Sequence, residues 1–346
     1  MSSSFCYPFT AIVEQEEMKL SLQLASIDPS LGGVLILGDR GTGKSTAVRA
    51  LANILPPIKV VDGCVFNCDL NKPTKICNVC NQKNSKLNKK KLVLQKKTVP
   101  VIDLPLGSTE DRIVGSLNMQ KALTKGLKEL EPGLLANANR GFLYIDEVNL
   151  LEDHLVDLLI DVSASGINII EREGLSLSHP ARFVLIGSGN PEEGDLRPQL
   201  LDRFGFSVDV TTPQDLTSRV EVIKRRQKFD LDPKIFLKKW EKNENDLSKQ
   251  ISSAQRRLAN IKTPDNILEK IAELCIFLKT DGLRGELTLS KASKALASLT
   301  RSRVVKIDHV KKVSSMCLRH RLRRDPLDDT SSNFRVERAL KEVFKN

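Results

Sequence analysis

The segment GDRGTGKST, residues 38–46, has the glycine and lysine spacing of a phosphate-binding loop. It lies between an apolar run at 34–37 and a helix-like segment at 47–52. Gly38, Gly43, Lys44 and Ser45 fit the pattern G-x-x-x-x-G-K-[ST]. In such a loop the glycines let the backbone curl, so that successive N–H groups point at a polyphosphate, and the following helix directs the positive end of its dipole at the same anion. The spacing therefore predicts a P-loop.

The chemistry of a P-loop assigns separate tasks to its residues. Lys44 is expected to reach the β- and γ-phosphates of ATP, and the Ser45 hydroxyl to bind Mg²⁺. A glycine-rich turn with a surface lysine is the alternative, but the strand before the segment and the helix after it favour the P-loop. The predicted nucleotide-binding residues are Gly38, Asp39, Arg40, Gly41, Thr42, Gly43, Lys44, Ser45 and Thr46.

A carboxylate pair follows a second apolar run, FLYI at 142–145. Asp146 and Glu147 would stand at the carboxyl end of a buried strand, the edge at which open α/β sheets bind ligands. Asp146 is expected to hold Mg²⁺ through water, and Glu147 to polarise the attacking water as general base. An Asp-Glu pair after a strand is usually a helix N-cap, but its combination with a P-loop favours the functional interpretation.

Three further polar residues are candidates for the same chemistry. Asn190 ends an apolar strand and precedes Pro191, so its amide is expected to position the attacking water, with an ordinary turn as the alternative. Arg203 and Arg284 are candidates for the positive charge that a transferring phosphoryl group requires beyond one lysine. For each arginine the alternative is a surface salt bridge.

The elements that must position these residues alternate between apolar runs and amphipathic segments. Predicted strands are 33–37, 99–104, 141–145, 182–187 and 205–210, with a hairpin at about 167–181. This alternation predicts an α/β fold with a parallel sheet and helices on both faces. Residues 1–212 are predicted to form this α/β core, with inserts at about 64–98 and 104–120. Residues 213–346, which include long amphipathic segments, are predicted to form an α-helical domain.

Composition narrows the class of protein. The chain has 346 residues, 40% hydrophobic and 28% charged, which indicates a globular protein. No apolar run reaches the roughly 18 residues of a membrane span, and the start of the chain does not resemble a secretory signal. The net charge is +11, but much of the excess lies in the lysine run at 83–97, which is typical of a solvated loop. With only 4% aromatic residues, no nucleic-acid partner is expected.

Seven cysteines without an export signal suggest thiols in a reducing compartment. Four of them have the spacing C-x3-C-x8-C-x2-C: Cys64, Cys68, Cys77 and Cys80. A zinc site and ordinary thiols on a variable loop both remain open, because the interval between the pairs is short for a zinc ribbon. Residues 67–97 are expected to form a polar loop. Cys275 and Cys317 are either buried thiols or a disulfide that would move Arg284.

Several long segments together resemble the ATPase (I) subunits of magnesium chelatases, within the AAA+ ATPases. They include EPGLLANANRGFLYIDEVNLLEDHLVDLLIDVSASG, EREGLSLSHPARFVLIGSGNPEEGDLRPQLLDRFG, DGLRGE and CLRHRLRRDPL. The resemblance runs from about Tyr7 to Leu327, and the segment from Cys64 to Lys97 departs from it. It implies that Arg203 is an arginine finger and Arg284 a second sensor.

The resemblance also implies the partners. ATPases of this kind use ATP and Mg²⁺ and form a homo-oligomeric ring, usually a hexamer. They work with a D subunit and with a large H subunit that holds protoporphyrin IX during Mg²⁺ insertion in chlorophyll biosynthesis. The chain is thus expected to be the ATP-hydrolysing motor of an ATP-dependent chelatase, meeting the porphyrin only through the H subunit.

Other proteins with a nucleotide site of this kind are the alternatives. A related AAA+ helicase or MoxR-like chaperone would suit the positive charge, and a non-hydrolysing scaffold would need only the nucleotide site. Intact Lys44, Asp146 and Glu147 disfavour the scaffold.

Because the matched region begins near the start of the chain and Lys and Asn are abundant, the expected location is the chloroplast stroma, with the gene in the plastid genome.

Overall fold

The computed structural model describes residues 5–69, 77, 80, 93–117, 130–172, 175–190, 192, 194, 196–322 and 332–344. The chain divides into two compact units. The first consists of Met1–Ile54 and Ser188–Asn346, and the second of Leu55–Gly187. The division predicted from sequence, between a core ending at residue 212 and a helical domain, rests on the pattern of elements and stays a prediction.

A five-stranded sheet with the order β11-β1-β10-β7-β4 carries the fold. Its strands are β1 (Val34–Gly38), β4 (Val101–Leu104), β7 (Phe142–Ile145), β10 (Val184–Gly189) and β11 (Phe206–Val210). In the first unit β1 pairs with β11 in parallel, with Val34 opposite Phe206. In the second unit β7 pairs in parallel with both β4 and β10. The five predicted strands and the α/β class are therefore confirmed.

The central strands were predictable because they are buried on both faces. All residues of β7 and of β10 are buried. A strand covered on both sides needs an unbroken apolar run rather than an alternating one, which is a strong signal in a sequence.

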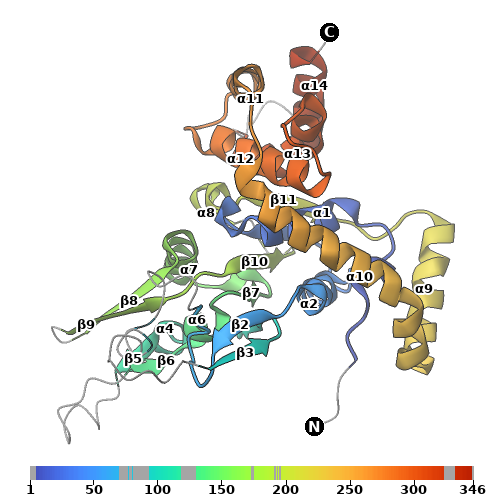
Figure 1. Cartoon of the computed structure of the whole chain (residues 1–346). Coiled ribbons are helices and arrows are strands. Elements are labelled where there is room, and N and C mark those ends of the chain that lie inside the picture. The colour runs from blue at the N-terminus through green and yellow to red at the C-terminus, as the bar shows by residue number, and fades with distance from the viewer. Residues whose placement is uncertain are drawn as a thin grey trace, which may run out of the picture. The chain divides into compact units, whose positions relative to one another are not determined.

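The first unit contributes most of the helices. They are α1 (Glu16–Ile27), α2 (Lys44–Ile54), α8 (Pro198–Arg203), α9 (Leu216–Leu231), α10 (Pro233–Arg257), α11 (Asp265–Leu278), α12 (Arg284–Leu299), α13 (Ile307–Leu318) and α14 (Ser332–Val343). Helix α12 packs against α13, and α11 against α14, near the carboxyl end of the chain (Figure 1). Within the described part of the chain no helix has the length and apolarity needed to span a membrane.

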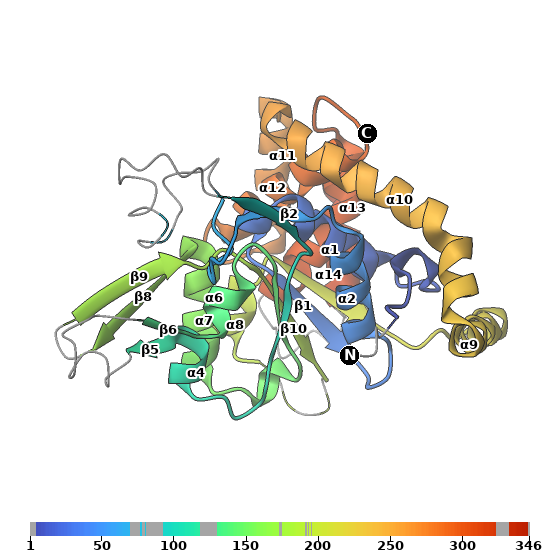
Figure 2. The same ribbon diagram turned by 60° about the horizontal axis from the view of Figure 1, so that its bottom comes forward.

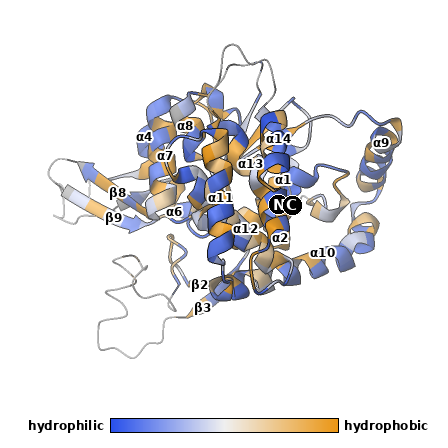
Figure 3. Ribbon diagram, turned by 90° about the horizontal axis from the view of Figure 1, so that it is seen from above, coloured by the Kyte–Doolittle hydropathy of each residue, from blue (hydrophilic) through white to orange (hydrophobic). Residues whose placement is uncertain are grey.

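The helical pattern after residue 213 is confirmed where the sequence predicted amphipathic segments. Figure 3 shows hydrophilic and hydrophobic residues alternating along α10 and α11. Helix α10 begins at Pro233 because Asp232 caps it, accepting a hydrogen bond of 2.9 Å from the Ile235 N–H, and Pro233 suits the first turn.

The second unit adds short helices and two-stranded ribbons to its part of the sheet. Its helices are α4 (Glu110–Val114), α6 (Leu134–Ala138) and α7 (Asp153–Ser165). Its ribbons pair β2 (Ile58–Val61) with β3 (Leu94–Lys97), β5 (Gly115–Leu117) with β6 (Leu130–Pro132), and β8 (Ile167–Arg172) with β9 (Leu175–Pro180) (Figure 2). The β8–β9 ribbon confirms the predicted hairpin.

The β2–β3 ribbon corrects the expectation of a loop through residue 97. Leu94–Lys97 form a strand that pairs antiparallel with Ile58–Val61, with Ile58 opposite Lys97. All four residues of β3 are exposed, so the strand lacks the apolar alternation by which a sequence reveals a half-buried strand. Most of the remaining predicted loop lies outside the described residues.

A buried arginine ties the carboxyl-terminal helices of the first unit to the segment before β11. The Arg321 side chain donates to the Asp202 carboxylate at 3.1 Å. It also donates to the backbone carbonyls of Asp202 and Phe204, at 3.0 and 2.6 Å, and to the Cys317 carbonyl. Because Arg321 is itself buried and binds several acceptors of this segment at once, it acts as a structural clamp.

Arg321→Met should lower the free energy of unfolding by about 1–3 kcal/mol, since it leaves buried carbonyl acceptors without their donor and removes one of the two arginines that pair with the Asp202 carboxylate. Chemical denaturation followed by circular dichroism measures the loss. Arg303→Met, at an exposed position, is the matched control and should change stability by less than about 0.5 kcal/mol. Equal stabilities of the two variants would show that Arg321 is not a clamp.

Candidate nucleotide-binding site

The P-loop segment links a strand to a helix, as its sequence predicted. Strand β1 ends at Gly38, and α2 begins at Lys44. Gly41 and Gly43 have φ values of 79° and 84°, which residues with side chains rarely adopt, and apart from their chain neighbours no described residue has an atom within 4 Å of the place a Cβ would occupy on either. The loop therefore curls as a phosphate cradle requires, with open space above these two glycines.

Gly38 has a different role from the other two glycines. A Cβ at this residue would lie 2.1 Å from the carbonyl oxygen of Val210, on the neighbouring strand β11. Glycine is thus required at the first position of the motif because β1 and β11 approach closely there. The sequence pattern identified the residue but not this reason.

Lys44 lies over the loop from which its helix starts. Its Nζ donates to the Gly38 carbonyl and, at 3.2 Å, to the Asp39 carbonyl. The Thr42 hydroxyl donates to the same Asp39 carbonyl at 2.9 Å. The ammonium group is thereby held on the side of the loop where phosphate oxygens would be its acceptors.

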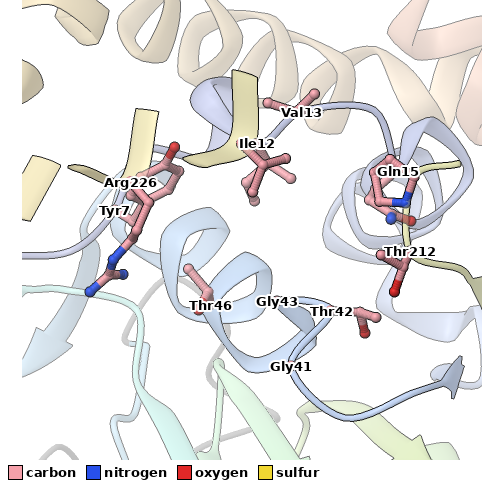
Figure 4. A pocket seen from close by; sticks show the side chains of 12 residues that line it. Tyr7, Ile12, Val13, Gln15, Gly41, Thr42, Gly43, Thr46, Thr212 and Arg226 are labelled. Carbon is pink, nitrogen blue, oxygen red and sulfur yellow. The ribbon is translucent and has the colours of Figure 1, made fainter. Parts of the chain in front are cut away.

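A cavity of about 350 Å³ adjoins this loop within the first unit. Gly41, Thr42, Gly43 and Thr46 line one part of it. Figure 4 shows Tyr7 and Arg226, Ile12 and Val13, and Gln15 and Thr212 around the other parts. The volume lies within the range of ligand pockets. Mainly apolar side chains beside a phosphate cradle suit a flat base such as adenine.

Sequence reasoning missed the cavity residues that lie outside the P-loop. They come from the start of the chain, from residues 212–213 and from α9, and only the folded chain brings them to the P-loop. Tyr7 is fixed there by its ring contact with Phe229, with ring centres 5.1 Å apart. Burial raises the pKa of the Tyr7 phenol, so the phenol is neutral at neutral pH, and the positive charge on this side of the cavity comes from Arg226. No spacing rule marks these residues, although the first of them belong to a segment that resembles the chelatase family.

Val222→Gln tests the cavity as the base site. Val222 lines the cavity and is 42% exposed, so a polar side chain can replace it without a buried defect. The lost apolar contact and the longer side chain should raise the Kd for ATP about 3- to 10-fold. Val220→Gln is the control, since Val220 lies on the same helix, is 38% exposed and is not among the cavity residues. Equal Kd values for the two variants, measured by titration with a fluorescent ATP analogue, would refute the assignment.

The carboxylate pair lies in the second unit, directly after β7. Asp146 is exposed and accepts a hydrogen bond of 3.1 Å from the Tyr144 hydroxyl. Glu147 has a φ of 56°, in the left-handed region that is uncommon for a residue with a side chain. Backbone strain of this kind concentrates at functional sites, which adds a structural reason to examine Glu147 as a catalytic group.

Asn190 and the two arginines lie in the first unit. Asn190 follows β10, and its side-chain oxygen accepts from the Glu192 N–H at 3.2 Å, which is the geometry of a turn. Arg203 is the last residue of α8. Arg284 begins α12 and donates to the Asp202 carboxylate at 2.7 Å, beside Arg203 in the chain. The predicted second sensor, Arg284, is thus paired with Asp202, the residue that precedes the predicted finger, Arg203.

The cysteines fall into two groups. The Sγ atoms of Cys64, Cys68, Cys77 and Cys80 lie within 4.8 Å of one another. Cys275 and Cys317 are buried free thiols, and burial raises the pKa of the Cys275 thiol to about 12. The structure therefore shows these two as core thiols rather than as a disulfide.

The P-loop between a parallel strand and a helix, the strand-end carboxylates and the helical carboxyl-terminal region define an AAA+ ATPase. The family model for the AAA lid domain matches residues 268–339. A crystal structure of a Cytophaga hutchinsonii protein, 16% identical, has a TM-score of 0.63 over 96% of this chain and 91% of its own, which supports the fold.

Closer comparisons show the family. The model described as magnesium chelatase, subunit ChlI, matches residues 115–211. The magnesium-chelatase 38 kDa subunit of Rhodobacter capsulatus is 56% identical, covering 98% of this chain and 94% of its own. The magnesium-chelatase subunit ChlI of Cyanophora paradoxa is 51% identical, covering 98% and 97%. The chain belongs to the family of magnesium chelatase ChlI subunits.

A cryo-EM-based structure of the magnesium chelatase complex between subunits BchI and BchD is also similar to this chain. One of its chains is 53% identical and covers 97% of this chain and 100% of its own, with a TM-score of 0.56. The similarity thus extends over nearly the whole chain, including both units.

Proposed function

We propose that this chain is the ATP-hydrolysing motor subunit of a magnesium chelatase, coupling ATP hydrolysis to Mg²⁺ insertion into protoporphyrin IX. The observation that carries the proposal is similarity over nearly the full chain to magnesium chelatase ChlI subunits, combined with a phosphate loop that opens onto a base-sized cavity. A helicase or a MoxR-like chaperone is not favoured, because the similarity to the chelatase subunits runs far beyond the shared ATPase motifs.

Within this proposal ATP binds at the P-loop, with its base in the cavity near Tyr7 and its β- and γ-phosphates at Lys44. Mg²⁺ bound with the nucleotide supplies charge neutralisation on the phosphates, and Ser45 and Asp146 are the residues that would hold it. Oxygen donors of this kind suit Mg²⁺.

The proposed catalytic residues act around the γ-phosphate. Glu147 takes a proton from the attacking water, and Asn190 orients that water. Arg203 neutralises charge on the phosphate of a neighbouring subunit, and Arg284 senses the nucleotide of its own subunit. For this last role, Arg284 must leave the Asp202 carboxylate, to which it is bound in this structure, and contact the nucleotide instead.

The proposed assembly is a hexameric ring that works with a D subunit and an H subunit. The BchI–BchD complex among the comparisons supports the D-type partner. The H subunit would hold the porphyrin, so this chain would contact protoporphyrin IX only indirectly, and no nucleic acid takes part.

The proposed location is the chloroplast stroma. Relatives at 51% and 50% identity come from Cyanophora paradoxa and Mesostigma viride, which bear plastids, although a bacterial relative reaches 56% identity. Immunodetection in fractionated cells tests the location, and signal outside the plastid fraction would contradict it.

Reconstitution tests the function. The chain is mixed with D and H subunits, ATP, Mg²⁺ and protoporphyrin IX, and fluorescence of the magnesium porphyrin is followed. The wild-type chain should give product, and Lys44→Ala should give none, because it lacks the charge at the β- and γ-phosphates. ATPase activity that DNA stimulates, with no metallated product, would favour the helicase alternative.

A further inference from the structure

Four cysteine thiols converge in the second unit, and none of them belongs to the residues proposed to handle ATP. Their Sγ atoms all lie within 4.8 Å of one another, and those of Cys64 and Cys77 are 3.9 Å apart. Cys68, Cys77 and Cys80 are buried, and Cys64 is half-buried. Val61 and Phe66 pack against the group, which shields it from water.

The sulfur distances match one tetrahedral ion. A Zn–S bond of about 2.3 Å places the sulfurs of a regular tetrahedron about 3.8 Å apart. An iron–sulfur cluster distributes its cysteines over several irons, which spreads the ligand sulfurs over a wider region. We propose that Cys64, Cys68, Cys77 and Cys80 together bind one Zn²⁺ ion as a closed, structural tetrathiolate site.

The surrounding backbone supports thiolate ligands. The Cys77 N–H donates to the Cys68 Sγ at 3.1 Å, and the Cys80 N–H donates to the Cys77 Sγ at 3.4 Å. Hydrogen bonds of this kind orient the sulfurs and stabilise their negative charge. Two of the four sulfurs thus already accept a backbone hydrogen bond within the cluster.

The site would brace the start of strand β7. The turn from Cys64 to Cys68 is bound to residues 139 and 140, which directly precede β7. Asn139 donates to the Phe66 carbonyl at 2.6 Å, and Asn67 donates to the Asn139 carbonyl at 3.2 Å. Arg140 pairs with Asp69 at 3.3 Å. A metal ion that fixes this turn therefore stabilises the beginning of the strand whose far end carries Asp146.

The experiment is metal analysis of the full-length protein, purified under reducing conditions without added metal. Elemental analysis by mass spectrometry should find about one zinc per chain, and X-ray absorption spectroscopy should show four sulfur ligands at about 2.3 Å from the zinc. Cys68→Ser should lose the zinc. Cys6→Ser, which changes a thiol outside the cluster, should keep it.

A second measurement tests the structural role. Removal of the ion with a strong chelator should accelerate hydrogen exchange in residues 58–69 and 139–145, and re-addition of Zn²⁺ should reverse the change. Unchanged exchange would overturn the bracing role.

The wild-type protein by itself decides the metal assignment, whether or not Cys68→Ser folds. Free thiols without metal, a Cys64–Cys77 disulfide in the purified protein, or iron in place of zinc would each overturn it.

Discussion

Arg203→Ala should bind ATP with nearly normal affinity and hydrolyse it roughly 10³–10⁵ times more slowly, the range measured for arginine fingers in other phosphoryl-transfer enzymes. Arg203 is the last residue of α8, and the residues on either side of it are fixed. Arg321 binds the carboxylate of Asp202 and the carbonyl of Phe204. The backbone that carries Arg203 is therefore held in place, as a finger that acts on a neighbour would require.

Mixing variants tests whether Arg203 acts on the neighbouring subunit. In a head-to-tail ring, Lys44→Ala subunits contribute an intact finger, and Arg203→Ala subunits an intact nucleotide site. A ring of either variant alone has no interface with both an intact finger and an intact nucleotide site. Some interfaces in mixed rings have both, so mixed rings should recover part of the ATPase activity. Arg256→Ala, an exposed position on α10, is the control and should keep wild-type activity. Mixed rings as inactive as the separate variants would make Arg203 a structural residue of its own subunit.

Glu147→Gln should retain ATP binding and lose turnover by about 10²–10⁴-fold, because an amide cannot accept the proton of the attacking water. The substitution keeps the size of the side chain, and glutamine tolerates the left-handed backbone at this position no worse than glutamate. Nucleotide titration separates binding from turnover, which is followed by phosphate release.

A neighbouring glutamate provides the control for Glu147. Glu152 precedes α7 and is exposed, so Glu152→Gln should keep normal turnover. Turnover in Glu147→Gln close to that of the wild type would remove Glu147 from the role of general base.

The sequence by itself determined the elements that bear local signals. Buried parallel strands such as Phe142–Ile145 require apolar runs, and amphipathic helices such as Asp265–Leu278 require apolar residues at helical spacing, so short windows of sequence were enough. The P-loop was equally clear, because a backbone that curls around phosphate needs glycines and a lysine within a few residues.

Only the tertiary structure decided the features that depend on contacts between distant parts of the chain. The exposed strand Leu94–Lys97 became recognisable through its partner Ile58–Val61. Gly38 proved necessary because Val210 approaches it, and Tyr7 joined the nucleotide cavity through its packing on Phe229. The spacing of Cys64, Cys68, Cys77 and Cys80 left both a metal site and ordinary thiols open, until the fold placed the four sulfurs together. Hydrophobic periodicity indicates which side of one segment is buried and which is exposed. The features above arise when segments far apart in sequence pack against each other, and no local pattern predicts such contacts.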